Sequence, residues 1–228
     1  MSKLPTHIGY IVDGNRRWAS ERGLVPWRGH YAGEKALEEV LLETVRAGVP
    51  YVSAYVFSTE NWKRSETEVS KLMALLVRVL KNKLKTFQKE NIRIVVLGTR
   101  DRLSQKVCDA IDTATKETAG NTGGTLVLCL NYGGQQEIAD ACKKIVQSGT
   151  SPDEITPELI EKSLYNPDIP PCDLIVRTSG EQRLSNFMLW RSAYSELLFV
   201  DKLWPDMTKA DVAAILEEYK RRGRRFGG

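Results

Sequence analysis

The chain has 228 residues, of which 42% are hydrophobic and 27% charged, with a formal net charge of +4. These values are those of an ordinary globular protein, and they exclude an intrinsically disordered chain. No apolar run approaches the ~20 residues of a membrane-spanning helix. The four cysteines form no CxxC pair, which argues against a zinc site or a secreted disulfide framework and favours a reducing, cytoplasmic location.

The length suits one domain, which we expect to span residues 1–228. The segment Met1–Pro5 runs almost directly into an apolar stretch, so we expect no signal or transit peptide. A net charge of +4 is too small to indicate nucleic-acid binding, but it suits an anionic ligand.

Short apolar segments alternate along the chain with segments of helical periodicity. Strands are predicted at 7–12, 51–57, 92–97, 125–130, 174–176 and 197–200. Helices are predicted around 36–45, 69–87, 103–114, 135–146, from Pro157, and over 209–222 after a Thr208 cap. This alternation predicts an α/β fold, a mostly parallel six-stranded sheet flanked by helices on both faces.

The segment Ser65–Glu68 predicts the start of the longest helix. The Ser65 hydroxyl can accept the backbone N–H of Glu68 while the Glu68 carboxylate reaches back, which is a capping box. The helix that follows carries apolar residues on one side as far as Phe87.

Polar clusters follow four of the predicted strands. In open α/β sheets, ligands bind outside the carboxyl ends of the strands. The clusters occupy residues 13–18, 58–64, 131–134 and 177–183. Their convergence predicts one ligand site at this edge of the sheet.

The first cluster has the residues of a phosphate site. A strand, a Gly14 turn and a helix start bring backbone N–H groups together, and the guanidinium groups of Arg16 and Arg17 fit phosphate oxygens. Asp13 would repel phosphate unless a cation lay between them, and Mg²⁺ is the usual ion for such a site. The alternative is an ordinary Asx–Gly turn in which Asp13 is a cap.

The cluster after the fifth strand predicts a second anion site. Arg177 and Arg183 lie close in sequence, with Ser185 nearby. The alternative is a surface loop whose arginines pair with Glu181, an arrangement that contributes little stability. Two arginine clusters favour two phosphorylated groups, on two substrates or one long one.

Several common catalytic motifs are absent from the sequence. It contains no P-loop GxxxxGK[ST], no GxGxxG after the first strand, no HExxH, no GxSxG and no DDxxD pair. Of the two histidines, His7 begins a strand and is expected to be structural. His30 could contact phosphate or be a plain helix-start residue.

Five ordered segments carry a family resemblance. They are HIGYIVDGNRRWA, FSTENWKR, LNYGG, IVRTSGEQRLSNFMLW and YSELLFVDKLWPD. Together they resemble the cis-prenyltransferases, the undecaprenyl diphosphate synthase family, from about residue 7 to 228. The resemblance implies a homodimer that condenses isopentenyl diphosphate head-to-tail onto an allylic prenyl diphosphate, forming a new cis double bond.

The resemblance also implies roles for individual residues. Asp13 matches the essential aspartate that positions Mg²⁺, Glu196 the second metal ligand, and Asn61 the residue that assists proton removal. Because an amide is a poor base, we interpret Asn61 as an orienting group. The expected substrate-binding residues are Gly14, Asn15, Arg16, Arg17, Trp18, His30, Ser58, Thr59, Glu60, Trp62, Arg64, Arg177, Arg183, Leu184 and Ser185.

The sequence departs from the family pattern at several positions. Long-chain members usually carry arginine where this chain has Pro26, with Arg28 two positions on as a replacement. Val56 is larger than the usual residue, and Gly124 is smaller than a residue some members use to close the hydrocarbon tunnel. These two differences point in opposite directions for product length. The Val69–Phe87 helix could line this tunnel or simply face the core.

Alternative functions remain open at this stage. One is an enzyme that makes short or irregular products, of the Z,E-farnesyl or lavandulyl type. Another is a non-catalytic partner subunit, which the presence of Asp13, Arg177 and Arg183 disfavours. A basic run at 220–225 could bind nucleic acid, although a solvated helix end or dimer contact explains it better. The matching tail, Arg225–Gly227, implies a contact with a neighbouring active site, and a long product implies peripheral membrane association.

Overall fold

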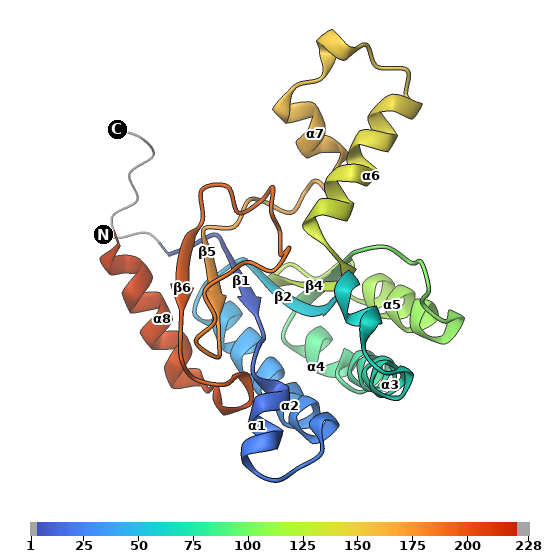
Figure 1. Cartoon of the computed structure of the whole chain (residues 1–228). Coiled ribbons are helices and arrows are strands. Elements are labelled where there is room, and N and C mark those ends of the chain that lie inside the picture. Colours follow the sequence, from blue (N-terminus) through green and yellow to red (C-terminus); the bar gives the residue numbers. More distant parts are fainter. Residues whose placement is uncertain (1–3, 223–228) are drawn as a thin grey trace.

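Six parallel strands form one sheet in the order β3-β4-β2-β1-β5-β6 (Figure 1). This computed structural model describes residues 4–222. Because all strands run the same way, their carboxyl ends meet at one edge. The strands are β1 (His7–Ile11), β2 (Tyr51–Ser58), β3 (Ile92–Leu97), β4 (Gly124–Tyr132), β5 (Leu174–Arg177) and β6 (Glu196–Phe199).

The predicted helices are present, but two differ from their predicted extent: α2 begins at Pro26, well before the stretch predicted around 36–45. The predicted helix through Phe87 is two helices, because the backbone turns at Lys83 and α4 then packs against β3. The α-helices are α1 (Asn15–Glu21), α2 (Pro26–Arg46), α3 (Glu66–Asn82), α4 (Leu84–Lys89), α5 (Gln105–Glu117), α6 (Gly134–Gln147), α7 (Pro157–Ser163) and α8 (Lys209–Arg221). Short 3₁₀ helices are η1 (Thr59–Lys63), η2 (Pro152–Glu154) and η3 (Trp204–Asp206).

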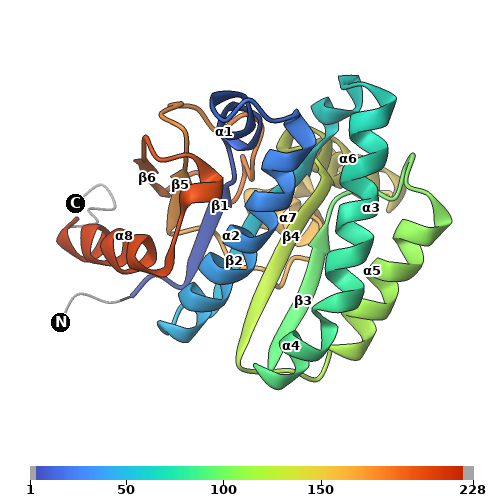
Figure 2. The same cartoon turned by 90° about the horizontal axis from the view of Figure 1, so that it is seen from below.

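The two faces of the sheet are covered differently. Alternate strand residues such as Tyr10 and Leu128 pack under α2, α3, α5 and α8, which lie together on one face (Figure 2). The opposite residues, such as Tyr55 and Val127, pack under the segment that surrounds β5, including Phe187. Helices α6 and α7 pack on each other and project from the sheet (Figure 1). No helix within residues 4–222 is long and apolar enough to cross a bilayer.

A buried ion pair anchors the chain that follows β5. Arg191 lies 2.5 Å from the Glu137 carboxylate of α6, and both side chains are almost fully buried. Arg191 also donates to the backbone oxygen of Tyr165, and the Tyr132 hydroxyl donates to Glu137. Removing one partner of such a pair typically costs about 3–5 kcal/mol. This network therefore holds the segment 183–188 in place beside the sheet edge.

His7 is structural, as its position at a strand start predicts. Its ring is fully buried, with Nδ1 2.8 Å from the Pro170 carbonyl oxygen and Nε2 2.6 Å from the Ser53 hydroxyl. In this arrangement Nδ1–H donates to the carbonyl and Nε2 accepts from the hydroxyl. Burial lowers the pKa of His7 to about 4, so the ring is neutral near pH 7.

Candidate active site

A cleft of about 710 Å³ opens at the carboxyl ends of the strands. Five arginines and two carboxylates line it, so its charge is predominantly positive. The clusters after β1, β2 and β5 converge there as predicted, whereas residues 131–134 after β4 do not line it. Its polar lining consists of Asp13, Asn15, Arg16, Arg17, His30, Tyr55, Ser58, Glu60, Asn61, Arg64, Arg177, Arg183, Ser185 and Asn186.

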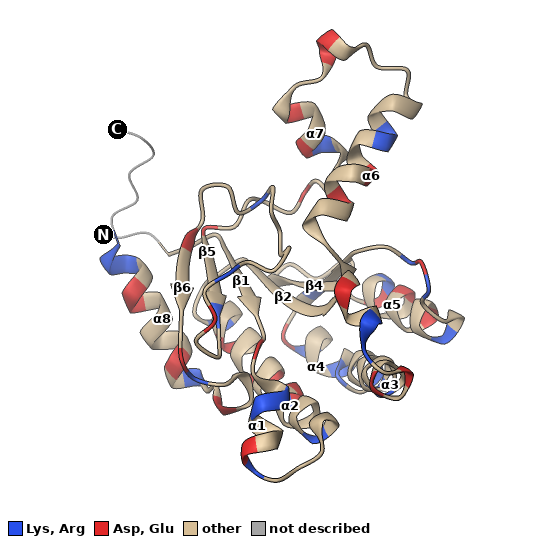
Figure 3. Ribbon diagram, viewed as in Figure 1, with Lys and Arg blue, Asp and Glu red and all other residues tan. Residues whose placement is uncertain are grey.

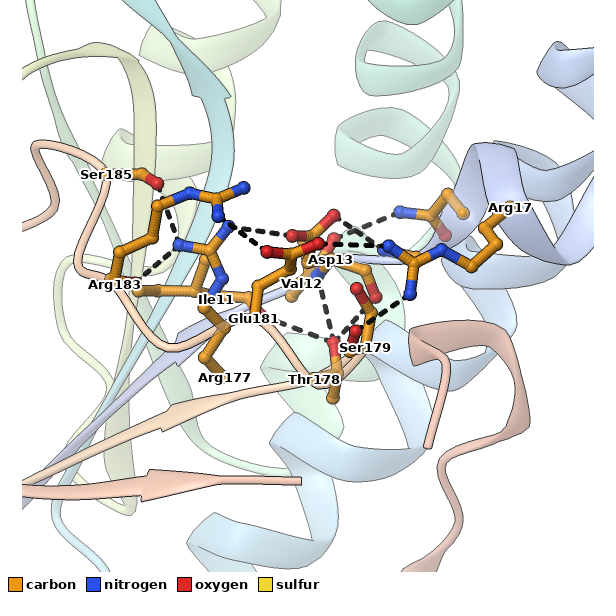
Figure 4. A network of polar contacts seen from close by, with 12 residues as sticks. Ile11, Val12, Asp13, Arg17, Arg177, Thr178, Ser179, Glu181, Arg183 and Ser185 are labelled. Carbon is orange, nitrogen blue, oxygen red and sulfur yellow. Dashed lines mark hydrogen bonds and ion pairs between the residues drawn. The ribbon is translucent and has the colours of Figure 1, made fainter. Parts of the chain in front are cut away.

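The two predicted anion sites meet at an ion pair between Asp13 and Arg177 (Figure 4). The Asp13 Oδ2 atom lies 2.8 Å from a guanidinium nitrogen of Arg177, and Oδ1 accepts the Gly14 N–H. Arg177 is buried and also donates to the Ser185 hydroxyl at 2.7 Å. β1 and β5 are neighbours in the sheet, which places their terminal residues side by side.

Thr178 holds the Asp13 backbone against the end of β5. Its hydroxyl accepts the Asp13 N–H at 3.0 Å and donates to the Asp13 carbonyl oxygen at 2.6 Å. Gly14 has a φ of +102°, and a Cβ there would lie 2.9 Å from the Leu203 side chain. The turn after β1 therefore requires glycine.

Helix α2 is notched to admit Asn15. A Cβ at Gly29 would lie 1.8 Å from the Asn15 carbonyl oxygen, and a Cβ at Gly33 2.0 Å from its Oδ1. The two glycines are one helical turn apart, so they form one notch. This close approach fixes the Asn15 amide at the cleft wall.

Glu181 links the arginines of the two predicted sites. Its carboxylate accepts from Arg17 at 3.1 Å and from Arg183 at 2.5 Å, as Figure 4 shows. Arg17 also donates to the Ser179 carbonyl oxygen. The Arg183–Glu181 ion pair, expected of a plain surface loop, is present. Because Glu181 also pairs with Arg17, it links the loop after β5 to α1 across the cleft.

Glu68 does not complete the predicted capping box. The Ser65 hydroxyl accepts the Glu68 N–H, but the Glu68 carboxylate turns to Arg64 at 3.1 Å, His30 at 3.7 Å and Arg16 at 4.0 Å. Three cationic or titratable groups outcompete one backbone N–H for a carboxylate. Burial, followed by the Arg64 charge, lowers the pKa of His30 to about 4, so this imidazole is neutral near pH 7.

The segment after β2 forms the short helix η1 under a true capping box. The Ser58 N–H donates to Asn61 Oδ1 at 3.1 Å, so the Asn61 amide NH₂ is the group left for the cleft. Glu60 accepts from Asn186 at 2.9 Å. Asn186 lines the cleft but was not predicted, although it lies directly after Ser185 in a quoted motif.

Four predicted substrate-binding residues do not line the cleft. Trp18 donates to Asp206, and Trp62 donates to the Asn131 side chain, both at 2.7 Å. Leu184 packs against the core on the β5 side. Thr59 lies beside Gly133, 2.8 Å from where a Cβ would stand. These residues support the cleft rather than face it.

Glu196 is not brought to the cleft of its own chain. It is the first residue of β6, paired with Leu174, whereas Arg177 at the cleft is paired with Phe199. Three residues of strand separate the two levels by about 10 Å. Glu196 instead lies 3.3 Å from Arg222. Within one chain Glu196 and Asp13 therefore lie at opposite ends of the parallel strands, and the role of Glu196 as second metal ligand stays a prediction. The matching tail at 225–227 lies outside the described residues.

Arg28 also lies outside the cleft. Its guanidinium stacks over the Trp27 ring at 4.5 Å, and it is not among the lining residues. Arg28 therefore stacks on Trp27 rather than lining the cleft, and a replacement of the arginine usual at position 26 stays a prediction.

An apolar groove of about 110 Å³ continues from the cleft between α2, α3 and the sheet. Val12, Asn15, His30, Val56 and Leu72 line both spaces, so they form the junction. The deeper lining is predominantly aliphatic and includes Leu37, Leu41, Leu42, Leu75, Leu76, Val79, Phe87, Leu126, Leu128 and Leu130.

Gly124 does not enlarge this groove. A Cβ at Gly124 would lie 2.5 Å from a Val45 methyl carbon, so Val45 already fills the space. Val56, by contrast, stands at the junction itself. Of these two positions, only Val56 lines the groove, and their effect on product length stays a prediction.

Unpartnered polar atoms indicate what the cleft binds. Four buried side-chain atoms of the described residues lack a hydrogen-bond partner, namely Asn15 Oδ1, His30 Nε2, Arg177 Nε and Ser179 Oγ. His30 and Arg177 line the cleft, where a polar ligand would satisfy their atoms, whereas Ser179 does not line it and Asn15 Oδ1 packs against Gly33. No group of three metal-binding side chains exists within residues 4–222. Asp13 is a carboxylate in the lining of the cleft, a residue type that can hold Mg²⁺ together with phosphate oxygens.

Comparison with known proteins now decides the family. The family model described as undecaprenyl diphosphate synthase matches residues 11–227. The chain belongs to this prenyltransferase family. The isoprenyl transferase of Bifidobacterium longum is 45% identical and covers all of this chain and 88% of its own length.

Two solved structures in the family share the fold of this prenyltransferase. Lavandulyl diphosphate synthase from Lavandula x intermedia, in complex with dimethylallyl diphosphate, has a TM-score of 0.95, 33% identity and 99% coverage of both chains. A probable undecaprenyl diphosphate synthase from Campylobacter jejuni has a TM-score of 0.84, 30% identity and full coverage of both chains. The enzyme class and the fold expected from the sequence are both confirmed.

Proposed function

We propose that this prenyltransferase condenses isopentenyl diphosphate with an allylic prenyl diphosphate to make a Z-polyprenyl diphosphate, with Mg²⁺ as cofactor. One observation supports this most directly: a cleft lined by five arginines and Asp13 opens into an aliphatic groove. Such a joined space suits a molecule with an anionic head and a hydrocarbon tail. Guanidinium groups suit its diphosphate, and the groove suits its chain.

Two sets of residues would each bind one of the two diphosphates. Arg16 and Arg17 on α1, with Gly14, Asn15, His30 and Arg64 nearby, would bind the allylic diphosphate. Arg177, Arg183 and Ser185 beyond β5 would bind isopentenyl diphosphate. Asp13 lies between the sets, 2.8 Å from Arg177. This arrangement would bring the allylic C1 atom toward the isopentenyl double bond.

The negative charge that develops on the departing diphosphate is the charge that the site most needs to stabilise. As the allylic C–O bond breaks, positive charge develops on carbon and negative charge on the departing oxygen. The arginines beside Asp13 stabilise that oxygen electrostatically. Bound Mg²⁺ would supply further charge neutralisation at the same oxygens, held by Asp13.

The proton lost from C2 of isopentenyl diphosphate needs an acceptor. Asn61 offers its NH₂ group to the cleft, because its Oδ1 accepts the Ser58 N–H. A donor cannot take a proton, so Asn61 would orient a diphosphate oxygen or a water that does. His30 is neutral near pH 7 and lies at the junction with the groove.

The product class has two candidates. The aliphatic groove favours a Z-polyprenyl chain. A short or irregular product of the Z,E-farnesyl or lavandulyl type is favoured by Val56 at the junction and by the TM-score of 0.95 to a lavandulyl diphosphate synthase. Product length separates them.

The assembly we propose is a homodimer through the β6 edge. β6 is the last strand of the sheet, and Leu197 and Tyr194 beside it are 38% and 77% exposed. A second copy could also present Glu196 to a metal bound by Asp13 of the first. We propose a cytoplasmic location with peripheral attachment to membrane. Light scattering of the purified protein tests the dimer, and a monomer would contradict it.

One assay tests the function. The full chain is incubated with labelled isopentenyl diphosphate and dimethylallyl, geranyl or farnesyl diphosphate, with Mg²⁺ or with a chelator, and products are sized by chromatography. Asp13→Ala should abolish turnover with an unchanged circular dichroism spectrum. A non-catalytic subunit would show no turnover with any primer, and salt-sensitive DNA binding by the inactive protein would support the nucleic-acid alternative.

A further inference from the structure

An apolar surface lies on the loop between α1 and α2 and on the first turns of α2. Leu24, Val25 and Tyr31 there are 43%, 51% and 37% exposed. Trp27 packs edge-on against Tyr31, with ring centroids 5.5 Å apart. We call Leu24, Val25, Trp27 and Tyr31 the tip surface, and Figure 1 shows its loop protruding beyond α1 and α2. None of these residues lines the cleft.

Cations surround the tip surface. Arg28 and Lys71 stand over the Trp27 ring at 4.5 and 4.7 Å, and Arg78 stands over Tyr31 at 4.5 Å. Among the described residues, neither Arg28 nor Lys71 forms an ion pair, whereas most other arginines near the cleft do. Figure 3 shows both basic and acidic residues on α2 and α3 around this region. The charges of Arg28 and Lys71 remain available to an anionic partner.

The tip surface adjoins the apolar groove. A small space between α2 and α3 is lined by Trp27 and Tyr31 on one side and by Leu72 and Leu75 on the other. The same two leucines line the groove. His30 also lines both spaces, so Leu72, Leu75 and His30 separate the groove from the tip surface. The seam is bridged on its outer side by ion pairs from Glu34 to Arg78 and from Glu38 to Lys83, the latter at 2.7 Å.

We propose that the tip surface docks on an anionic phospholipid bilayer. Tryptophan and tyrosine rings favour the headgroup region, and exposed aliphatic side chains add burial in the acyl boundary. Lysine and arginine beside them are attracted to lipid phosphates. An acidic protein would satisfy the cations but not Leu24 and Val25, so a bilayer fits the whole surface better.

Docking in this way would place the α2–α3 seam against the lipid. This second part of the inference rests on the proposed function, because it concerns the hydrocarbon in the groove. A product chain longer than the groove would then pass between α2 and α3, beside Leu72 and Leu75, into an apolar phase rather than into water. Docking itself requires no substrate and no turnover.

Vesicle co-sedimentation of the purified full chain, without substrates, tests docking. We use vesicles of phosphatidylcholine alone or with 30% phosphatidylglycerol. Binding is expected to be at least about tenfold stronger with phosphatidylglycerol and to weaken with added salt. The Trp27 fluorescence should shift to the blue on binding, and Trp27→Phe should remove that shift.

Variants separate this surface from the rest of the molecule. Leu24→Ser with Val25→Ser should weaken binding by about tenfold or more, and so should Arg28→Gln with Lys71→Gln. The matched control is Val146→Ser with Ile155→Ser, which changes two exposed aliphatic residues near α6 and α7. All three should keep turnover with soluble short primers in detergent.

The outcomes are distinct for docking and for catalysis. Equal loss of binding in the control pair, or no binding to either vesicle, overturns the docking proposal even if the enzyme is active. Selective loss in the tip variants supports docking even if no product forms. For the exit route, release of long product should accelerate on anionic vesicles, and the Leu24/Val25 variant should lose that acceleration. An unchanged acceleration in this variant overturns the exit route.

Discussion

Asp13 Oδ2 and a guanidinium nitrogen of Arg177 lie 2.8 Å apart, joining the ends of two neighbouring strands at the centre of the cleft. Arg177 is only 4% exposed, so this is a largely desolvated contact on its side. The pair balances the charges of Asp13 and Arg177 before any ligand arrives, while the other arginines keep the cleft positive. Diphosphate bound to Arg177 would replace the negative charge of Asp13, and a cation bound to Asp13 would replace the positive charge of Arg177. We therefore expect the diphosphate and the cation to bind cooperatively.

Arg177→Gln is expected to lower kcat/KM by about 10²- to 10³-fold, because it removes a buried charge aimed at the diphosphate. Arg183→Gln is the control, since Arg183 is 59% exposed and should cost about tenfold. Steady-state kinetics with isopentenyl diphosphate varied will measure both. Equal effects would show that burial of Arg177 has no special importance.

Thr178 is a positioning residue for Asp13. Thr178→Val removes the hydroxyl that contacts both the N–H and the carbonyl of Asp13, and we expect kcat to fall about tenfold with little change in KM. Thr178→Ser keeps the hydroxyl and should keep most activity. The Mg²⁺ concentration for half-maximal activity should rise in the valine variant alone. A loss of activity in both variants would contradict this role.

Asn61→Asp separates orientation from helix capping. The aspartate can still accept the Ser58 N–H, but it replaces an NH₂ donor by an anion beside the diphosphates, so kcat should fall about 10²-fold. Asn61→Ala loses the cap as well, at a cost of about 1 kcal/mol. Rapid-quench measurement of a single condensation checks the chemical step. Full activity in Asn61→Asp would show that the amide is not required.

Val56 is expected to limit product length. Val56→Ala should shift the products toward longer chains and Val56→Leu toward shorter ones, because the side chain stands where the cleft meets the groove. Gly124→Ala is the matched control. Its methyl group would meet Val45, so it should destabilise the fold by about 1–3 kcal/mol and leave the product distribution unchanged. Longer products from Gly124→Ala would argue against this account.

Because His7 is buried in its neutral form, we expect the free energy of unfolding to decrease as the pH falls below about 6.5. Its pKa is about 4 in the folded protein and about 6.5 when unfolded, so between these values only the unfolded chain gains the proton. The contribution is intact above pH 6.5 and is lost as the pH falls toward 4, and the loss at pH 4.5 is about 2–3 kcal/mol.

Denaturant unfolding at pH 6.5 and pH 4.5 checks this. His7→Gln cannot titrate, so its stability loss between the two pH values should be smaller than that of the natural protein by about 2 kcal/mol. His7→Gln is expected to be less stable than the natural protein already at pH 6.5. The quantity to compare is therefore the change in the free energy of unfolding between pH 6.5 and pH 4.5. An unchanged difference would mean that His7 is not the titrating group.

Local patterns in the sequence were sufficient for the elements and for the edge of the sheet that binds ligand. The strand at 92–97 and the Thr208 cap depend on residues near one another in the chain, so periodicity predicts them. The polar residues after Asp13 and after Arg177 could be assigned to one edge, because parallel strands align their carboxyl ends. The family motifs then identified the chemistry of that edge.

Contacts between distant segments were decided only by the tertiary structure. Glu68 was predicted to cap its own helix, but α1 and α2 bring Arg16 and His30 to it. Asn186 lines the cleft because its side chain bonds Glu60 and the Gln135 N–H, which belong to other elements. Glu196 lies away from the cleft because the register of β6 on β5 places it at the other end of the strands. Residue types and local periodicity can be read from a short stretch of sequence. Contacts between distant residues depend on how whole helices and strands pack, and no short stretch of sequence contains that information.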